Sequence, residues 1–134
     1  MIVNICEPSY YKGKIYASGL GGLKCFNIDN GDIVWKRKDI GSWNTLALSD
    51  DKLIITFDKY VEEDTYIGSV IALNVNTGKT LWYTELSGHV SSFSSASIAY
   101  NRIYVTSKSV FPKKSWKNSH IMSRLEHGKI IVEN

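Results

Sequence analysis

Histidine and cysteine are the residues of this chain best suited to bind a metal ion or to act as nucleophiles. His89, His120 and His127 lie far apart in the sequence, without the short spacings that zinc sites favour. We expect them to be polar turn and loop residues. Cys6 and Cys25 are 19 residues apart and form no Cys-x-x-Cys pattern. Two free, partly buried thiols are therefore expected in place of a disulfide or a metal pair, and no metal site is predicted.

Two charged segments have the composition of binding loops. Residues 59–66 include the acidic cluster Glu62, Glu63 and Asp64, whose oxygens could hold a cation, although a solvated turn is the simpler interpretation. Residues 108–118 are basic and aromatic, and could stack on bases or contact an anionic surface. A solvent-exposed loop, or one that pairs with the acidic segment, is the simpler alternative. The side chains suited to such contacts are Lys108, Phe111, Lys113, Lys114, Trp116 and Lys117.

Two further patterns superficially resemble catalytic motifs. Five serines lie between Ser91 and Ser97, but they form no Gly-x-Ser-x-Gly nucleophile elbow. In an alternating strand they are expected to be small packing residues. Residues 19–22, Gly-Leu-Gly-Gly, lie between two predicted strands, with no helix N-terminus that could hold a phosphate. Neither pattern predicts an enzyme.

The composition indicates one globular domain, residues 1–134. Hydrophobic residues make up 43% of the chain and charged residues 22%, which excludes a disordered class. Eight tyrosines, four tryptophans and four phenylalanines against two prolines favour a β-rich fold. Because the net charge is only +3, no nucleic-acid partner is expected.

The sequence also bears on location. No apolar run approaches the roughly 20 residues of a membrane helix, so no membrane insertion is expected. No signal peptide is recognised, which indicates a cytoplasmic location for the chain as it stands. That expectation would not hold for a fragment of an exported protein.

A short phrase occurs three times along the chain. Gly31, Gly78 and Gly128 each precede a short apolar run. These glycines are separated by 47 and 50 residues, a spacing typical of β-propeller blades. Trp35 and Trp82 lie four residues after the first two glycines, whereas a valine follows the third glycine at the same distance.

The repeat divides the chain into three units, about residues 1–40, 41–88 and 89–134. Each unit reads as four short strands, because β-branched and aromatic runs alternate with polar turns. The two charged segments both connect the second and third strands of their units, so we expect them on one face of the array. The expected strands are Ile2–Cys6, Lys14–Ser18, Gly22–Ile28, Asp32–Lys38, Trp43–Leu48, Lys52–Asp58, Ile67–Val75, Lys79–Glu85, Phe93–Ala99, Arg102–Ser107, Ser119–Leu125 and Lys129–Glu133.

Residues 72–82 resemble the A-x-D-x-x-T-G-x-x-x-W signature of PQQ-like, quinoprotein-type β-propeller blades. The matching residues are Ala72, Thr77, Gly78 and Trp82. Asn74 stands where the family favours aspartate. The first copy, residues 25–35, keeps the glycine and the tryptophan, and the third, residues 122–132, keeps only the glycine and the apolar run. The resemblance covers nearly the whole chain and implies an all-β fold, a partial β-propeller of about three four-stranded antiparallel blades.

The resemblance further implies a structural role for the motif tryptophans. In such propellers the motif tryptophan packs between adjacent blades, and its indole N–H finds a backbone acceptor. Trp35 and Trp82 are therefore expected to join each blade to the next, and a large aromatic side chain with one polar group suits such a dry junction. Val132 fills less space and has no side-chain donor, so the outer junction of the third blade is expected to be weaker.

The catalytic features of quinoprotein dehydrogenases have no counterpart here. The resemblance would imply a quinone stacked on tryptophan beneath an adjacent Cys-Cys disulfide, a calcium ion held by Glu and Asn oxygens, and an Asp base. The two cysteines of this chain are not adjacent, and no motif places the calcium ligands or the base. We therefore expect neither enzyme activity nor a cofactor.

Three blades do not close a propeller, which typically has four to eight. Open blade faces would expose apolar surface. Association with copies of the chain, pairing with other blade-containing chains, and a fragment of a longer propeller are the open alternatives. The function we expect is that of a non-catalytic scaffold or protein-binding module, whose partner is another protein or further blades. The alternatives are a remnant or subunit of a PQQ-dependent dehydrogenase and a subunit of an envelope assembly scaffold.

Overall fold

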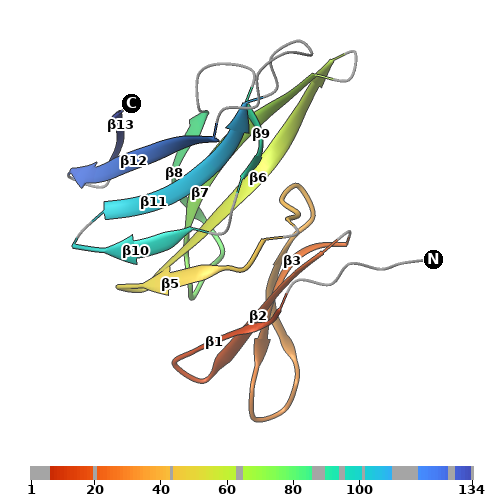
Figure 1. Cartoon of the computed structure of the whole chain (residues 1–134). Helices are drawn as coiled ribbons and strands as arrows, with labels where there is room; N and C mark the ends of the chain where they lie inside the picture. The colour runs from red at the N-terminus through yellow and green to blue at the C-terminus, as the bar shows by residue number, and fades with distance from the viewer. Residues whose placement is uncertain are drawn as a thin grey trace.

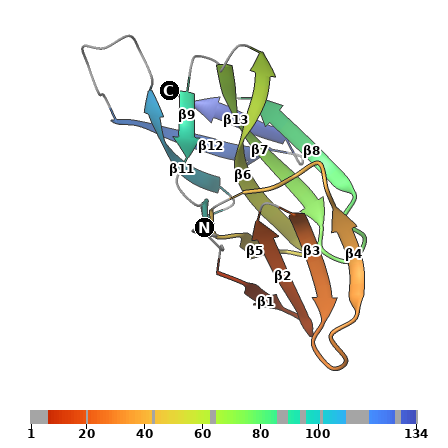
Figure 2. The same cartoon turned by 90° about the vertical axis from the view of Figure 1, so that its right-hand side faces the viewer.

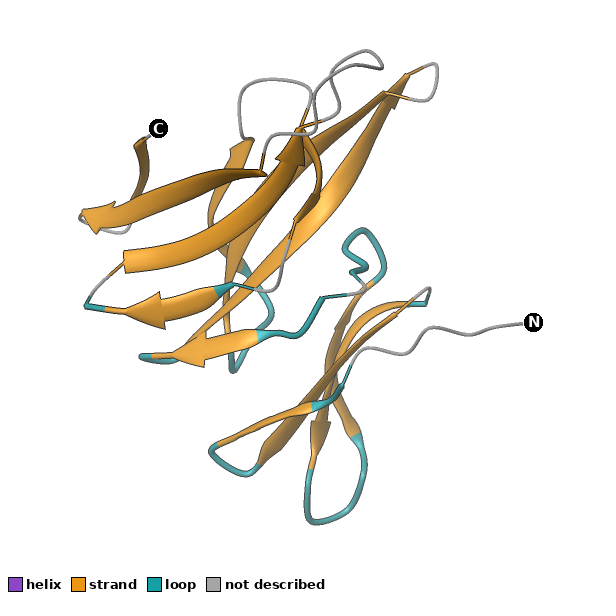
Figure 3. Cartoon of the chain, in the orientation of Figure 1, coloured by secondary structure: helices purple, strands orange, loops and turns teal. Residues whose placement is uncertain are grey.

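The chain is built from β-strands and turns. The computed structural model describes residues 7–19, 21–42, 44–62, 65–85, 90–93, 96–100, 102–109, 118–126 and 129–133. Within these ranges there is no helix (Figure 3). The all-β prediction is therefore confirmed.

The strands form three antiparallel sheets, each made from a continuous stretch of chain (Figure 1). The first sheet contains β1 (Ser9–Tyr11), β2 (Lys14–Gly19), β3 (Gly22–Asn27) and β4 (Ile33–Arg37). The second sheet contains β5 (Ala47–Ser49), β6 (Lys52–Glu62), β7 (Thr65–Asn74) and β8 (Thr80–Glu85). The third sheet contains β10 (Ser97–Ala99), β11 (Arg102–Ser109), β12 (Asn118–Glu126) and β13 (Lys129–Glu133), and β9 (Val90–Phe93) pairs with β11 beside this path. Strand order in each sheet follows the sequence, as the threefold repeat predicts.

The second sheet lies between the first and the third (Figures 1 and 2). It buries apolar side chains on both of its faces, which explains the continuous apolar run at Leu53–Ile55. Because side chains alternate across a strand, Leu53 and Ile55 join the cluster shared with the first sheet. Ile54 points the other way, into a cluster with Ile103 and Val105 of the third sheet.

Two tight turns join the first two strands of their sheets. Lys12 and Gly13 have φ angles of 44° and 77°, and Asp50 and Asp51 have φ angles of 49° and 57°. Positive φ at both central residues is the conformation that two-residue hairpin loops favour, because it matches the twist of the flanking strands. These turns fix the register of β1 with β2 and of β5 with β6.

The first strand of the first sheet differs from the prediction. The apolar run at residues 2–6 was expected to form it, but those residues lie outside the described ranges, and the strand that pairs with β2 is Ser9–Tyr11. The tight turn at Lys12–Gly13 decides this pairing. Its counterparts in the other sheets, Ala47–Ser49 and Ser97–Ala99, have the same length and the same place before a turn.

The acidic segment 59–66 is a second correction, because most of it is strand and not loop. β6 continues to Glu62 and β7 begins at Thr65, and Tyr60 pairs with Tyr66. β6 is thus 11 residues long, against six for β2. Aromatic and β-branched residues at 60, 61, 65 and 66 favour the strand, and their pairing outweighs the local negative charge.

Two other predicted strands are shorter or divided. The strand expected over Trp43–Leu48 is formed by Ala47–Ser49, and Trp43 lies outside the described residues. The strand expected over Phe93–Ala99 is divided, because β9 ends at Phe93 and pairs with the far end of β11 across a register shift at Ser107/Lys108.

Candidate functional site

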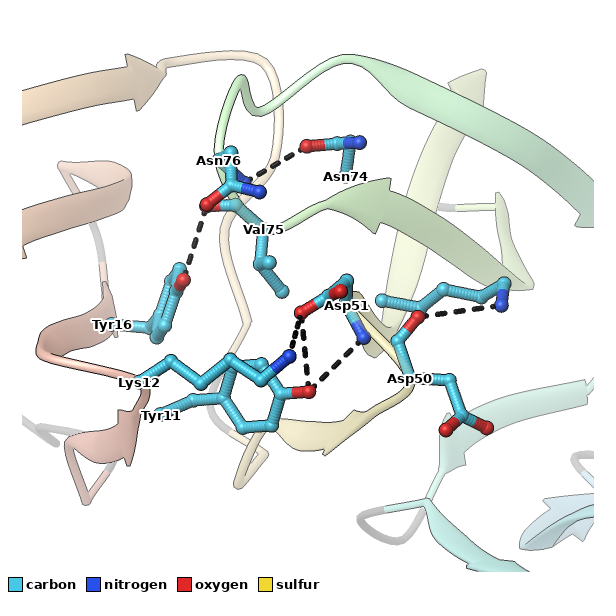
Figure 4. A network of polar contacts seen from close by, with 9 residues as sticks. Tyr11, Lys12, Tyr16, Asp50, Asp51, Asn74, Val75 and Asn76 are labelled. Carbon is cyan, nitrogen blue, oxygen red and sulfur yellow. Dashed lines mark hydrogen bonds and ion pairs between the residues drawn. The ribbon is translucent and has the colours of Figure 1, made fainter.

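A turn at the end of β7 forms the centre of the junction between the first two sheets. The Asn74 side-chain oxygen accepts the backbone N–H of Asn76 at 2.9 Å (Figure 4). The Asn74 carbonyl accepts the N–H of Gly78 at 2.8 Å. Gly78 has φ of 70°, a conformation that glycine adopts without steric cost. The turn leaves the carbonyl of Val75 directed at the first sheet.

Two side chains of the first sheet share that carbonyl. The Trp35 indole N–H donates to the Val75 oxygen at 2.9 Å, and the Tyr16 hydroxyl donates to it at 3.0 Å. A Cβ on Gly78 would lie 2.6 Å from the Trp35 ring, so the indole is seated directly on the glycine. The motif glycine is therefore required twice, for its backbone angle and for the close approach of the tryptophan.

A polar contact closes the edge of the same junction. The Lys12 ammonium lies 2.7 Å from the Asp51 carboxylate, and the Tyr11 hydroxyl accepts the Asp51 backbone N–H at 3.1 Å (Figure 4). The hydrogen bond from Lys12 lowers the pKa of Asp51. Both charged side chains are more than half exposed, so this pair orients the sheets more than it stabilises them.

The connection between β4 and β5 is tied into the junction by hydroxyl groups. Ser42 donates its backbone N–H to the Ser18 hydroxyl at 2.9 Å and its own hydroxyl to the Thr56 carbonyl at 2.6 Å. Both serines are buried, and each polar group has a partner, which avoids the cost of an unpaired buried donor. Ile40, in the same connection, fills the apolar cluster beside them.

Cys25 lies in this cluster as a buried free thiol. Burial raises its pKa, and it also raises that of the neighbouring Tyr16. A thiol with a raised pKa is a poor nucleophile at neutral pH, so Cys25 acts as a small apolar group. Cys6 lies outside the described residues.

A hollow of about 370 Å³ opens beside the junction, between the first and second sheets. Its apolar lining comes from Ile40, Phe57 and Ile71, and polar side chains surround it. The lining residues are Arg37, Asp39, Ile40, Phe57, Lys59, Ile71, Thr80 and Tyr83. An apolar floor with a few placed polar groups is the usual composition of a binding site.

The polar groups around the hollow are held in place by one another. Arg37 makes two contacts with Asp39, at 2.8 and 2.6 Å, and donates to the Gly78 carbonyl at 2.9 Å. The hydrogen bond from Arg37 lowers the pKa of Asp39. This guanidinium therefore crosses from β4 to the turn of the second sheet.

A second polar group at the hollow belongs to the second sheet. Lys59 is 3.0 Å from Glu85, and the Tyr83 hydroxyl donates to the same carboxylate at 2.8 Å. The hydrogen bond with Glu85 raises the pKa of Lys59, and burial raises that of Tyr83. Ser69 reaches the Tyr83 hydroxyl at 3.0 Å. The lysine is thus charged, half exposed and positioned at the edge of an apolar surface.

The junction between the second and third sheets repeats the packing but not the polar contact. Ile54, Val70 and Ala72 of the second sheet form an apolar cluster with the third sheet, and Trp82 packs against this cluster. Its indole N–H is buried, and no residue in the described part of the chain accepts it. The two motif tryptophans therefore occupy comparable places with different hydrogen bonding.

The other residues singled out from the sequence fall into three groups. Ala72 is buried opposite Trp82, and Thr77 and Gly31 are exposed turn residues. Glu62 pairs with Thr65 at the tip of the β6–β7 hairpin. Outside the described residues lie Glu63, Asp64, Lys113, Lys114, Trp116, Lys117 and Gly128.

Sequence reasoning missed the residues around the hollow except Lys59, which lies in the predicted binding segment 59–66. Arg37, Lys59 and Tyr83 come from three strands, and nothing in their spacing connects them. The repeat was the one sequence signal that could have indicated them, because Arg37 and Tyr83 closely follow the motif tryptophans Trp35 and Trp82 in the sequence and line the hollow. In the described ranges, no group of three or more His, Cys, Asp or Glu could hold a metal ion. Nor do those ranges include a helix that could cross a bilayer.

Successive antiparallel sheets, two of four strands and one of five, with Trp35 of the first seated on the turn of the second, define a segment of a PQQ-like β-propeller. A solved structure, BamB from Moraxella catarrhalis, shares this fold with a TM-score of 0.65 at 20% sequence identity. The match covers 94% of this chain and 33% of that one, so the chain spans about a third of its length.

The family itself is shown by the sequence match. A family model described as outer membrane protein assembly factor BamB matches residues 4–84, more than half of the chain, and the chain belongs to this family. No curated protein sequence matches the chain.

Proposed function

We propose that the chain is a non-catalytic scaffold segment that binds a protein partner at the hollow between its first and second sheets. The observation that carries this proposal is the combination of an apolar floor with fixed charges of both signs at its edge. A rigid β framework with polar groups held in advance loses little entropy on binding. The family description, an assembly factor, is also that of a protein that acts through other proteins.

The partner would insert an apolar side chain over Phe57 and Ile71 and place a carboxylate near Lys59. The lysine extends from the long hairpin of β6 and β7, the segment in which the sequence predicted a binding loop. Its ammonium is half exposed and lies above the Tyr83 ring, 5.7 Å from the ring centre. The basic segment 108–118 is the second predicted binding loop, and its residues 110–117 lie outside the described part of the chain.

Peptide display on the full chain tests this proposal. A selected peptide should bind the wild type and lose roughly tenfold in affinity or more with Lys59→Glu, because a charge at the edge of the hollow is reversed. Lys36→Glu is the matched control, since Lys36 is exposed on β4 outside the hollow. Calorimetry would give the Kd of the peptide for both variants and for the wild type. Equal losses in the two variants, or no selected peptide, would contradict a binding site at the hollow.

The family description favours a second candidate, a subunit of an envelope assembly complex. This role requires the chain, or the longer protein that contains it, to be in the cell envelope. The cytoplasmic location expected from the sequence is the competing proposal. Fractionation of the source cells with an antibody to the chain decides between them, since detection only in the cytosol would contradict the envelope role.

A further inference from the structure

A second hollow, of about 320 Å³, opens between the second and third sheets. It lies beside the turns that follow β5 and β10, and it shares no lining residue with the hollow described above. We call it the turn pocket. Its volume is at the lower end of the roughly 300–1,000 Å³ that small-molecule sites occupy. Its lining combines apolar side chains with charges of both signs and a tyrosine, and includes Ser49, Asp50, Lys52, Ile54, Ile98 and Tyr100.

The corresponding place in the first junction is filled by side chains of the chain itself. The Tyr11 hydroxyl donates to the Asp51 carboxylate at 3.3 Å, and the Lys12 ammonium lies 2.7 Å from the same carboxylate. The second sheet has Ser49 at the strand position of Tyr11. It has Asp50 at the position of Lys12, the first residue of the turn. An aromatic ring and an ammonium are thus replaced by a serine and a carboxylate, and the second junction has a pocket where the first has side chains.

The two charges of the turn pocket come from one turn. In Figure 4 the Asp50 carboxylate points away from Asp51 and Lys12. No residue in the described part of the chain forms an ion pair with it. The Lys52 ammonium donates to the Asp50 carbonyl at 3.5 Å, a long contact that a carboxylate acceptor would replace. A ligand with both an ammonium and a carboxylate would therefore find a partner for each group.

The rest of the turn pocket is apolar and aromatic. Ile54 is buried in the cluster with the third sheet, and Ile98 packs against that cluster. Tyr100 differs from both, because it is 94% exposed and has φ of 49°. Positive φ strains a bulky residue, and tight hairpin turns favour asparagine or glycine at such positions. Strained residues cluster at ligand sites, and here the strain presents an uncovered ring beside a pocket.

We propose that the turn pocket binds a free aromatic α-amino acid. Its ammonium would pair with Asp50 and its carboxylate with Lys52, while its ring would lie over Ile98 and against Tyr100. A ligand with one charge would cover the pocket and leave the other charged side chain without a partner, which is costly. The aromatic class is favoured because two rings attract each other beyond the area that they bury. This site is separate from the hollow and does not depend on the function proposed above.

Titration of the isotope-labelled full chain with L-phenylalanine, followed by NMR, tests this proposal. Amide signals of residues 49–54 and 97–100 should shift in a saturable way. Phenethylamine lacks the carboxylate, phenylpropionate lacks the ammonium and L-alanine lacks the ring, so each should bind roughly tenfold more weakly or worse. The absence of saturable shifts, or equal binding by the single-charge probes, would overturn the proposal. Binding of Phe-Gly-Gly or Gly-Gly-Phe as tight as that of phenylalanine would also overturn it, since the ligand would then be a chain terminus.

Charge variants test the two assigned contacts separately. Asp50→Asn should weaken phenylalanine binding roughly tenfold without weakening that of phenylpropionate, which has no ammonium to lose. Lys52→Gln should weaken phenylalanine but not phenethylamine. Asp29→Asn and Lys14→Gln are the matched controls: Asp29 is an exposed turn residue outside the pocket, and Lys14 holds the position of Lys52 in the first sheet. Equal weakening of all probes, or equal losses in the controls, would overturn the pairing of charges.

Tyr100→Asn separates binding from folding. Asparagine tolerates positive φ, so this variant should raise Tm by a few degrees while it weakens phenylalanine binding severalfold. A tyrosine with a purely structural role would give the opposite pattern, a lower Tm with unchanged affinity. That pattern would overturn the place given to the ring in the proposed site.

Discussion

The two junctions between the sheets of this molecule each contain a motif tryptophan, but the two tryptophans make different contacts. Between the first and second sheets, Trp35 donates to Val75, lies on Gly78 and is accompanied by the Tyr16 hydroxyl. Between the second and third sheets, Trp82 is packed but its buried N–H has no acceptor in the described part of the chain. The comparison teaches that the motif tryptophan supplies only half of a junction, and the turn of the next sheet supplies the other half.

The cause of the difference lies four residues before each motif glycine. Asn27 and Asn74 occupy this place in the first two sheets, and each accepts a backbone N–H two residues on, which starts the turn. Arg124 stands there in the third sheet, and its guanidinium cannot accept that hydrogen bond, because it has only donors. β12 instead runs on to Glu126, and Leu125, the counterpart of Val75, pairs with Ile130 inside the strand.

Removing either tryptophan should produce the largest effect. Trp35→Ala should lower the free energy of unfolding by about 3–5 kcal/mol, because it leaves a cavity in the larger of the two clusters and removes a hydrogen bond. Trp82→Ala should cost roughly 1–2 kcal/mol less, because it also removes an unpaired buried donor. Urea unfolding measures both values, and a larger loss for Trp82 would reverse the ranking of the junctions.

The next largest effect should be the difference in stability cost between alanine substitutions at the motif glycines. Gly78→Ala places a methyl group 2.6 Å from the Trp35 ring, and it should cost about 1–3 kcal/mol in overpacking beyond the strain of its positive φ. Gly31→Ala has the same strain with open space around it, and should cost only about 1–2 kcal/mol. Thermal unfolding compares the two, and equal costs would mean that contact with the indole is unimportant.

A substitution in the third sheet should strengthen the weaker junction. Arg124→Asn should allow the turn to form and give Trp82 an acceptor, raising the free energy of unfolding by about 1 kcal/mol. Arg124 lies directly opposite Arg102, so loss of charge alone could stabilise the sheet. Arg124→Gln controls for this, since it removes the charge but favours no turn. An equal rise in the free energy of unfolding in both variants would mean that the lost charge, and not the turn, causes the gain.

The smallest effect concerns pH. The hydrogen bond from Lys12 holds the pKa of Asp51 below its usual range, so the folded state keeps this carboxylate ionised at lower pH than the unfolded state does. Its contribution is present above the unfolded pKa of about 3.9 and is lost as pH falls through the lower folded value. Asp51→Asn should therefore flatten the decline in Tm below about pH 4. Lys12→Met should flatten the same part of the Tm-versus-pH profile. A profile unchanged in both variants would contradict a contribution of the Lys12–Asp51 ion pair to stability.

The fold was largely predictable from the sequence, because the repeat encodes it locally. Gly31 and Gly78 fixed the turns, and apolar runs such as Leu53–Ile55 fixed the strands around them. The strand at Ser9–Tyr11 was not predictable, because it has three residues and its pairing depends on a turn at Lys12 that no turn preference indicates. The length of β6 was missed because cross-strand pairing outweighs the local charge.

The candidate site was much less predictable. The hollow depends on how two sheets lie against each other, and its lining comes from residues such as Arg37, Lys59 and Tyr83, which are distant in sequence. Single-sequence patterns report periodicity along a strand and not contacts between sheets. Charge composition instead directed attention to segments 59–66 and 108–118, and among their described residues only Lys59 lines the hollow.

The most direct test of the central claim replaces each tryptophan by phenylalanine, which keeps the aromatic ring and removes only the N–H donor. Trp35→Phe should lower the free energy of unfolding by about 1 kcal/mol beyond the loss for Trp82→Phe, because Trp35 has an acceptor to lose and Trp82 has none among the described residues. Urea unfolding of the two variants, with the wild type in parallel, gives this difference. Equal losses, or a larger loss for Trp82→Phe, would contradict the claim that the turn of the following sheet completes the junction.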